Sequence, residues 1–375
     1  MEKIYKVPFY ALGIFLDLDD LCNLSYVHPY FAEEIYHKMK PIISVESIVE
    51  IHNMNSFFRN AKYRFSTYWP DYVVDEDFKN IHNITELNLS GGCKVTDRGI
   101  MSQTNLEILH LSNTPRITDK GLMHLTNLRE LNLYNNSEIT DYAFKYMPLL
   151  KKLIMTDNKI ITDAGLLHLQ NLTELNMSFS SIIRGSSLAS LSNLVKLNIR
   201  GNKMINNKVL QNMINLTSLN LTDNKNIKDI SLKNLVNLTE LNLEHNIKIT
   251  DGSVRCLTNL VKLNLSNCSG VGDDGIRQLT RLTCLNLMSN TKITDEGIKH
   301  LTRLKRLDIC DNIKITDDGI RNLTNVTFLN LCNNHNITDS GLVKLTNLVY
   351  LDVENNTKIT VKGAFAASYL ANFDQ

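Results

Sequence analysis

Residues 270–275 read Gly-Val-Gly-Asp-Asp-Gly, a spacing that matches the glycine-rich loops that bind nucleotide phosphates. Such a loop has to join a strand to the helix of a crossover unit, and that context is absent here. A pattern that recurs along the chain explains each residue without a phosphate: Val271 belongs to an apolar column, Asp273 to a helix start and Gly275 to a recurring glycine. We therefore expect no nucleotide at this segment.

Side chains that could bind a metal also recur at a fixed spacing. His124, His168 and His300 fall in one column of the pattern, too far apart to share one ion, and we expect them on the surface. Cys310 and Cys332 fall on neighbouring strands, about 5 Å apart by strand spacing. A metal site needs further ligands, and no histidine joins these two cysteines. We expect two reduced surface thiols, no metal and no cofactor.

The remaining composition points away from catalysis. No Ser-His-Asp or Cys-His arrangement stands out, so we predict no catalytic residues and no enzyme. The net charge is +1, with 40 Lys and Arg against 39 Asp and Glu, which provides no general field for nucleic acid or an anionic membrane. No apolar run has the length of a membrane span. Seven cysteines, an odd number, fit a reducing compartment, so we expect the cytoplasm or the nucleus, or the host cytoplasm for a viral protein.

All of these residues belong to one text that recurs through the chain. Residues 285–304 read LNLMSNTKITDEGIKHLTRL, with two leucines alternating as in a half-buried strand and a Thr-Asp pair as a helix start. The leading leucine returns every 22 residues without an insertion or deletion. Its thirteen positions are Leu87, Leu109, Leu131, Leu153, Leu175, Leu197, Leu219, Leu241, Leu263, Leu285, Leu307, Leu329 and Leu351. Such a period indicates a solenoid, in which stacking buries the apolar edge of each repeat.

Each repeat combines a short strand, a turn and one turn of helix. We expect the apolar positions and the sixth residue, such as Asn334, to face inward, with the amide bonding backbone groups of neighbouring turns. The text, LxxLxLxxN followed by xxITDxGLxxL, resembles the leucine-rich repeat over roughly residues 80–370. The resemblance implies an α/β solenoid, a single elongated right-handed horseshoe with a parallel concave sheet and short convex helices.

Residues 1–45 do not follow the repeat. Their apolar residues fit three short helices with one apolar seam, and Asp20 can cap the second helix. Leu16-Asp17-x-x-Asp20-Leu21, followed by Val27 and Phe31, resembles the F-box, although Val7-Pro8 lies about three residues too close to Leu12. The resemblance implies a small helical domain that binds the adaptor subunit of a ubiquitin ligase. Its candidate contacts are Pro8, Leu12, Leu16, Asp20, Leu21 and Val27. The alternative is a helical cap with no ligase contact.

Residues 46–86 connect this segment to the array. Counting back 22 residues from Leu87 gives Phe65, and further apolar residues then fall on the inward columns: Val73, Phe78, Ile81 and Ile84. We interpret residues 46–86 as a connecting helix and a degenerate capping repeat, and residues 87–372 as thirteen repeats with a C-terminal cap formed by Leu370 and Phe373.

The residue between the two strand leucines points onto the concave face. This column is mostly Asn, which we interpret as a solvated default, so that departures from it are informative. The candidate target-binding residues are Arg306, Asp308, Phe328, Tyr350, Asp352 and Glu354. A weaker second cluster is Phe179, Arg200, Glu244 and His245. The alternative is that solvent-facing strands commonly carry Tyr and Phe.

The order of an F-box-like segment before leucine-rich repeats is similar to that of F-box/leucine-rich-repeat proteins. The resemblance implies a substrate-recognition subunit of a cullin–RING ubiquitin ligase, with the adaptor on the F-box and a target protein on the concave face. We expect a monomer within a hetero-complex, without nucleic acid or membrane. The alternative is a scaffold or host-interaction protein with no ligase contact.

Overall fold

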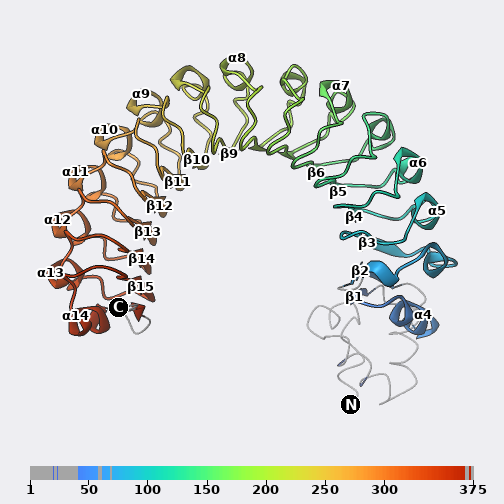
Figure 1. Ribbon diagram of the computed structural model, residues 1–375, viewed down its shortest axis with the longest axis horizontal. Helices are drawn as coiled ribbons and strands as arrows, with labels where there is room; N and C mark the ends of the chain where they lie inside the picture. Colours follow the sequence, from blue (N-terminus) through green and yellow to red (C-terminus); the bar gives the residue numbers. More distant parts are fainter. Residues whose placement is uncertain are drawn as a thin grey trace, which may run out of the picture. The chain divides into compact units, whose positions relative to one another are not determined.

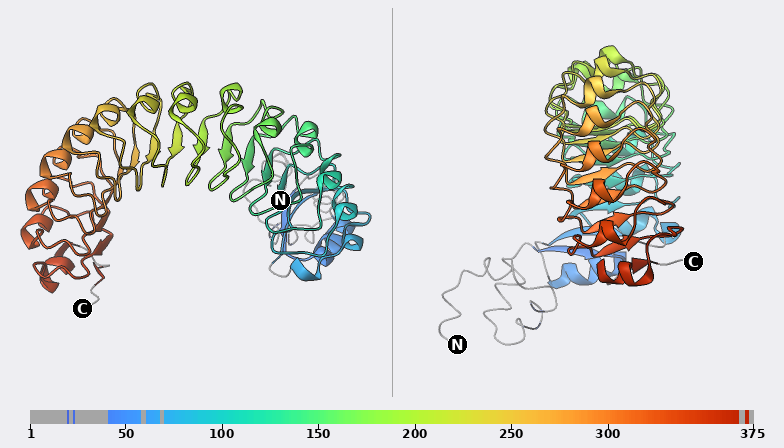
Figure 2. Two further views of the ribbon diagram at one scale, coloured as in Figure 1. Left: turned by 45° about the horizontal axis from the view of Figure 1, so that its top comes forward. Right: turned by 90° about the vertical axis from the view of Figure 1, so that its left-hand side faces the viewer.

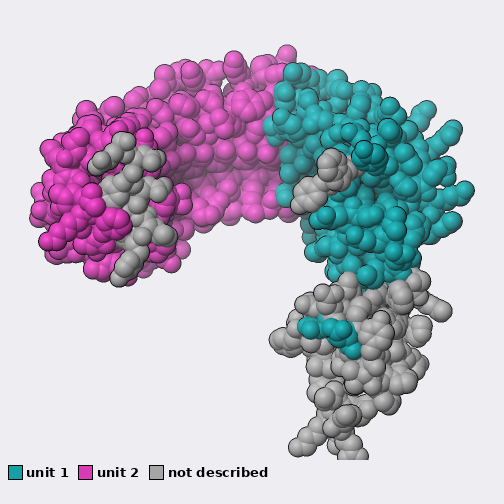
Figure 3. Space-filling view, turned by 60° about the horizontal axis from the view of Figure 1, so that its bottom comes forward, with its two compact units in different colours: residues 1–171 teal, residues 172–375 magenta. Residues whose placement is uncertain are grey.

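The computed structural model describes residues 20, 23, 41–57, 61–67, 70–367 and 371–372. The chain divides into two compact units, Met1–Asn171 (unit 1) and Leu172–Gln375 (unit 2), which Figure 3 colours separately. Asp20 is helical and exposed, and the other predicted F-box contacts, Pro8, Leu12, Leu16, Leu21 and Val27, lie outside the described residues, as do Leu370 and Phe373.

Unit 1 is a parallel sheet whose strands alternate with short helices. In chain order its elements are β1 (Ile42–Val45), α4 (Ile48–Phe57), β2 (Lys62–Ser66), η3 (Pro70–Tyr72), η4 (Asp75–Phe78), β3 (Ile84–Asn88), α5 (Asp97–Ile100), β4 (Ile108–His110), α6 (Asp119–Leu122), β5 (Glu130–Asn132), η5 (Ala143–Tyr146), β6 (Lys152–Ile154) and α7 (Asp163–Leu166). Leu87 lies opposite Leu109, and Leu109 opposite Leu131, so the predicted column is in register. Strand β1, which pairs with β2, was not predicted.

Unit 2 continues the same alternation. Its elements are β7 (Glu174–Asn176), η6 (Leu188–Ser190), β8 (Lys196–Asn198), α8 (Asn207–Leu210), β9 (Ser218–Asn220), η7 (Asp229–Ser231), β10 (Glu240–Asn242), α9 (Asp251–Val254), β11 (Lys262–Asn264), α10 (Asp273–Ile276), β12 (Cys284–Asn286), α11 (Asp295–Ile298), β13 (Arg306–Asp308), α12 (Asp317–Ile320), β14 (Phe328–Asn330), α13 (Asp339–Leu342), β15 (Tyr350–Asp352), α14 (Val361–Ala367) and β16 (Ala371–Asn372). Within this unit the strands lie on the inner side and the helices on the outer side (Figures 1 and 2). The predicted α/β class with parallel strands and short helices is confirmed.

The core follows the predicted columns. The strand leucines and the apolar residues of the helical turns are almost all fully buried, and the capping positions Phe65, Val73, Phe78, Ile81 and Ile84 are buried as well. At the far end Ala364 and Ala367 of α14 take the places of the larger leucines. Burial of apolar side chains at about 25 cal/mol per Å² is the main stabilising contribution in such a stack.

Inward-facing asparagines connect neighbouring repeats, as predicted. The amide Nδ2 of Asn290 donates to the carbonyl of Cys268 at 2.8 Å, in the preceding repeat. Its Oδ1 accepts from the backbone N–H groups of Lys292 and Ile293, each at 3.0 Å. The side chain thereby pairs backbone groups that the stack would otherwise bury unpaired.

A second ladder runs through the helical turns and was not predicted. The sequence indicated that the Thr-Asp pair starts a helix, and Thr316 does cap α12 by accepting from the N–H of Asp318. The aspartate also accepts a hydrogen bond from the backbone of the next repeat: Asp295 Oδ1 lies 2.8 Å from Thr316 N, and Oδ2 lies 2.7 Å from Thr316 Oγ1. The same contact recurs from Asp75, Asp97, Asp119, Asp141, Asp229, Asp251, Asp273, Asp317 and Asp339 to a backbone N–H 21 residues later.

The ladder also explains the recurring glycine. A Cβ atom on Gly297 would lie 2.5 Å from Asp273 Oδ1, which is closer than a carbon can approach an oxygen. In two repeats the motif changes and the helical turn is a 3₁₀-turn. Ala143 occupies the glycine position in η5, and the cap position before η7 is Lys228, which has no capping hydrogen bond. The three residues of the ITDxGL text therefore act together. Thr caps the helical turn, Asp accepts hydrogen bonds from the next repeat, and Gly leaves space for the Asp side chain of the preceding repeat.

Candidate functional site

The last strands of unit 2 bring the predicted target-binding residues together. Each of the strands β13, β14 and β15 starts one residue before the first of two buried positions of its repeat. The residues before, between and after these two buried positions point away from the core. Arg306, Phe328 and Tyr350 lie opposite one another in register, and Asp308, Asn330 and Asp352 do the same. We call the set Arg306, Asp308, Phe328, Tyr350, Asp352 and Glu354 the C-terminal patch.

The C-terminal patch contains a continuous stack. The rings of Phe328 and Tyr350 are parallel, with an interplanar angle of 4° and centroids 4.5 Å apart. The guanidinium carbon of Arg306 lies 3.5 Å from the centroid of the Phe328 ring, in a cation–π contact. Both aromatic side chains are half-buried and Arg306 is exposed. Three side chains from three successive repeats therefore form one flat, partly exposed surface.

Asp308 and Asp352 have a structural role in the patch. Asp308 Oδ1 accepts from the N–H of Cys310 at 3.1 Å, and Asp352 Oδ1 accepts from the N–H of Glu354 at 3.0 Å. Burial raises the pKa of the Asp308 carboxyl, and the charge of Asp352 adds to the increase, although hydrogen bonds and Arg306 act in the opposite direction. Each of these two carboxylates thus holds the turn that follows its strand.

The concave asparagines make the same turn contact. Asn286 Oδ1 accepts from the N–H of Met288 at 2.9 Å, and Asn330 Oδ1 accepts from Cys332 at 3.0 Å. The interpretation of this column as a solvated default was therefore incomplete, because each amide holds the turn that follows its strand. An Asx turn is a local sequence signal and could have been found in advance.

Next to the patch, unit 2 has a shallow hollow of about 380 Å³ over β9 to β13. Cross-strand ion pairs occupy its floor and its continuation: Glu240 pairs with Lys262 and Glu174 with Lys196, both at 2.6 Å. The hydrogen bond and charge of Lys262 lower the pKa of Glu240 against a smaller opposing effect of burial. The charged side chains of these two pairs therefore neutralise each other.

Cys310 and Cys332 follow the strands of the patch. Cys310 is buried and Cys332 half-buried, so the prediction of two surface thiols was wrong for Cys310. Its Sγ contacts Asp311 Oδ2 at 3.5 Å, and burial together with the neighbouring Cys332 raises the pKa of the Cys310 thiol strongly. Among the residues that the structure describes, no group of three or more potential ligands could hold a metal ion.

The four residues of the weaker predicted cluster form two separate pairs in unit 2, Phe179 with Arg200 and Glu244 with His245. Arg200 lies over the ring of Phe179, with its guanidinium carbon 5.6 Å from the ring centroid, and its Nε lies 3.6 Å from Asp223. Phe179 and His245 both have a left-handed backbone, with φ of 58° and 59°, at a turn position where most repeats carry Asn or Asp. Glu244 lies 3.7 Å from His245. Arg200 and Asp223 thus form an ion pair in this region of the face.

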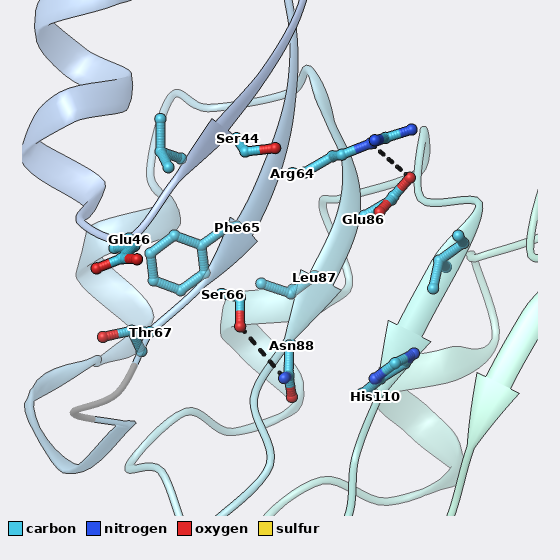
Figure 4. Close-up of a pocket in the computed structure, with 12 residues that line it drawn as sticks. Ser44, Glu46, Arg64, Phe65, Ser66, Thr67, Glu86, Leu87, Asn88 and His110 are labelled. Atoms are coloured by element: carbon cyan, nitrogen blue, oxygen red, sulfur yellow. Dashed lines mark hydrogen bonds and ion pairs between the residues drawn. The ribbon is translucent and has the colours of Figure 1, made fainter. Parts of the chain in front are cut away.

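Unit 1 has a hollow of about 570 Å³ on its strand face, which sequence reasoning did not identify. Figure 4 shows its polar lining: Arg64 pairs with Glu86 at 2.7 Å, and the Asn88 amide donates to Ser66 Oγ at 3.3 Å. His110 at its edge lies 3.6 Å from Glu130. Arg64, Glu86, Ser66 and Asn88 therefore have partners within the lining, whereas His110 Nε2 is buried without a hydrogen-bond partner.

Other sequence candidates have structural roles. A Cβ on Gly270 would collide with the carbonyl oxygen of Ile249, so this glycine of the GxGxxG match permits a close backbone approach. His124, His168 and His300 are exposed, as predicted. No helix in the described part of the chain is long and apolar enough to span a bilayer.

The strand and helix ladders, repeated at one spacing, define a leucine-rich-repeat protein. The chain belongs to the family described as BspA type leucine rich repeat region, whose model matches it in 6 copies over residues 66–173, 181–299 and 256–372. Curated proteins provide no significant match. Among solved structures, an internalin of Listeria monocytogenes is 26% identical, with a TM-score of 0.59 over 80% of this chain and 89% of the internalin.

Two further structures share the fold alone. A leucine-rich-repeat protein of Leptospira interrogans is 21% identical, with a TM-score of 0.63 over 88% of this chain and all of that protein (100%). A chain of the yeast Rad7–Elc1 complex is 19% identical, with a TM-score of 0.51 over 78% of this chain and 81% of its own length.

Proposed function

We propose that this chain is a non-catalytic protein-interaction module that holds a target protein on the strand face of unit 2, centred on the C-terminal patch. The observation that supports this proposal is the stack of Arg306, Phe328 and Tyr350 on an open face. Tyrosine and arginine, two of the three side chains in this stack, are among the residue types that dominate binding energy at protein interfaces. The hollow that Arg306 and Asp308 help to line extends over β9 to β13, which suits an extended protein surface better than an enclosed small molecule.

The test is a comparison of variants in native-cell co-purification. The double variant Phe328→Ala with Tyr350→Ala removes the stack from the tagged full chain. The control is Tyr142→Ala with Tyr146→Ala, which removes an aromatic pair from the helical side of unit 1, where the ring centroids are 5.6 Å apart. We expect the recovery of one co-purifying protein to fall at least about tenfold with the patch variant and to stay unchanged with the control. Equal recovery of every protein with both variants would contradict the proposal.

The finer proposal is that the module serves a ubiquitin ligase. It is supported by the resemblance of residues 1–45 to the F-box and by their place before the repeats, with residues 46–86 as the connecting segment and residues 87–372 as the array. The yeast Rad7–Elc1 complex offers a chain of similar fold in a complex with a second protein. A role in such a complex would place the chain in the cytoplasm or nucleus.

Direct binding to a purified ligase adaptor tests this finer proposal. An F-box buries an apolar seam against its adaptor, and a charge in that seam is costly to desolvate. We expect the full chain to bind and the double variant Leu16→Asp with Leu21→Asp to lose binding. The patch variant should keep adaptor binding. Absence of binding by the native chain at micromolar concentration would leave the alternative, a scaffold or host-interaction protein without ligase contact.

A further inference from the structure

The C-terminal patch differs in charge from the rest of the strand face of unit 2. Over β7 to β11 the acidic side chains have cationic partners, as in the Glu174–Lys196 and Glu240–Lys262 pairs. Over β13 to β15, no cationic side chain of the described residues lies within 4 Å of the carboxylates of Asp308, Asp352 and Glu354, which would make an ion pair. The patch therefore combines three carboxylates with a single cation, Arg306, and presents a net negative charge beside an aromatic surface.

The charge at two of these positions is not needed for the fold. Asp308 and Asp352 accept the N–H group two residues later, and Asn286 and Asn330 make the same contact at the same repeat position with a neutral amide. Aspartate in place of asparagine thus adds negative charge without adding a structural hydrogen bond. Burial disfavours the ionised form of Asp308 in the unliganded protein, and a bound cation would favour that form.

We propose that the C-terminal patch binds an extended, cationic segment of the partner protein, with lysine or arginine side chains directed at Asp308, Asp352 and Glu354. This inference rests on the proposed function and specifies its partner.

The geometry of the patch favours this occupant over others. Charge-assisted hydrogen bonds from a guanidinium or ammonium group to a carboxylate are stronger than neutral ones. The aliphatic stem of a basic side chain can lie against the Phe328–Tyr350 stack while its charged end reaches Asp352. An acidic segment would instead meet three carboxylates and one cation, Arg306, which already lies over the Phe328 ring.

A peptide selection with the full chain provides the test. A random library of peptides about 12 residues long is selected on the immobilised chain, and the enriched peptides are measured in solution by fluorescence anisotropy. The charge variant combines Asp308→Asn, Asp352→Asn and Glu354→Gln, and keeps the side-chain oxygens that accept the turn hydrogen bonds. The control combines Asp274→Asn, Glu296→Gln and Asp318→Asn on the helical side, which makes the same change in net charge.

We expect enriched peptides to be rich in Lys and Arg, and their affinity to fall at least about tenfold in the charge variant and less than about twofold in the control. Their affinity should also weaken as salt rises. Enriched peptides of neutral or acidic composition that depend on Phe328 and Tyr350 would overturn the inference and leave the proposed function intact. Peptides that are insensitive to both the charge variant and the patch variant, or an absence of enrichment, would overturn the inference and count against the proposed function.

Discussion

Asp317 and Thr338 lie 21 residues apart in the chain and are joined by two hydrogen bonds, from Thr338 N to Oδ1 at 2.8 Å and from Thr338 Oγ1 to Oδ2 at 2.7 Å. The same threonine caps the next helical turn by accepting from Ser340 N. One side chain thus ties a repeat to its successor at the place where the successor's helix begins. The cohesion of the helical side therefore depends on a carboxylate and not on apolar packing alone.

Replacement of this carboxylate should weaken the array. We expect Asp317→Ala to lower the free energy of unfolding by about 1–3 kcal/mol, because it leaves the half-buried Thr338 N–H and hydroxyl without their acceptor. The control is Asp318→Ala, which changes the next residue, an exposed carboxylate paired only with Arg321. Thermal and urea unfolding of both variants provide the measurement. Equal destabilisation by the two changes would contradict a structural role for the ladder.

The recurring glycine offers a steric test of the same ladder. Gly297→Ala should destabilise, because the new methyl group would collide with Asp273 Oδ1. Gly252→Ala is the matched control, since its nearest atoms would be 3.4 Å away, an ordinary contact. We expect a loss of about 1–3 kcal/mol for the first variant and no loss, or a gain of about 0.5 kcal/mol, for the second. If both variants unfold at the same midpoint as the native chain, the steric explanation of the glycine is wrong.

Acid should weaken the ladder at Asp229. Burial on its own would raise the pKa of this carboxyl, but hydrogen bonds from Thr250 and Ser253 outweigh it and hold the pKa below the ordinary value of 3.8. A carboxyl with a depressed folded-state pKa contributes stability above its unfolded pKa and loses it as the pH falls through the folded value. The stability difference between the native chain and Asp229→Asn should therefore be constant above about pH 5 and narrow below it. A difference that stays constant down to pH 3 would exclude this contribution.

Replacement of an inward-facing asparagine should reduce stability more than replacement of an asparagine on the strand face. Asn290→Leu removes two donated and two accepted hydrogen bonds inside the stack, and we expect a loss of about 2–4 kcal/mol from buried groups left unpaired. Asn286→Ala removes only the half-exposed turn contact to Met288, for a loss of about 0.5–1.5 kcal/mol. Urea midpoints measure both. The reverse order would mean that the inward and outward columns are exchanged.

Thiol labelling should report burial directly. Cys256 is exposed, whereas Cys93, Cys268 and Cys310 are buried, and burial is the first cause of the raised pKa of each buried thiol. A maleimide reagent near neutral pH should therefore modify Cys256 first, because the thiolate is the reacting form. Mass spectrometry of digests, in a Cys22→Ser background, follows each site. Rapid modification of Cys310 would contradict its placement beneath Asp311 and Cys332.

The repeat allowed the sequence to predict the core and the patch. A strand buries alternate residues and the repeat has a constant length, so Leu307, Leu329 and Leu351 had to align, and the residues beside them had to form columns. Arg306, Phe328 and Tyr350 were adjacent for the same reason. The stacking angle and the cation–π contact depend on side-chain rotamers, which periodicity does not determine.

The features that the sequence did not predict depend on contacts with neighbouring repeats or on local backbone turns. Asp295 was interpreted only as part of a helix start, because a Thr-Asp pair already explains that role locally. Its hydrogen-bond partner, Thr316, belongs to the next repeat and cannot be recognised from the local sequence. Strand β1 has no place in the 22-residue period and was therefore not predicted. Cys310 alternates outward but is small and lies beside Cys332 and Asp311, so its neighbours cover it.

The forward contact from each aspartate has an evolutionary consequence. Most of the described joints use the same Asp–Thr pair, so a duplicated 22-residue segment brings with it both the acceptor for its successor and the threonine that its predecessor requires. An array of this kind can lengthen by tandem duplication without new compensating substitutions at the junction. Asn207 shows how far one joint can drift: its Oδ1 alone accepts from Lys228 N at 2.8 Å and from Ser231 Oγ at 2.6 Å, in a repeat that has lost the threonine.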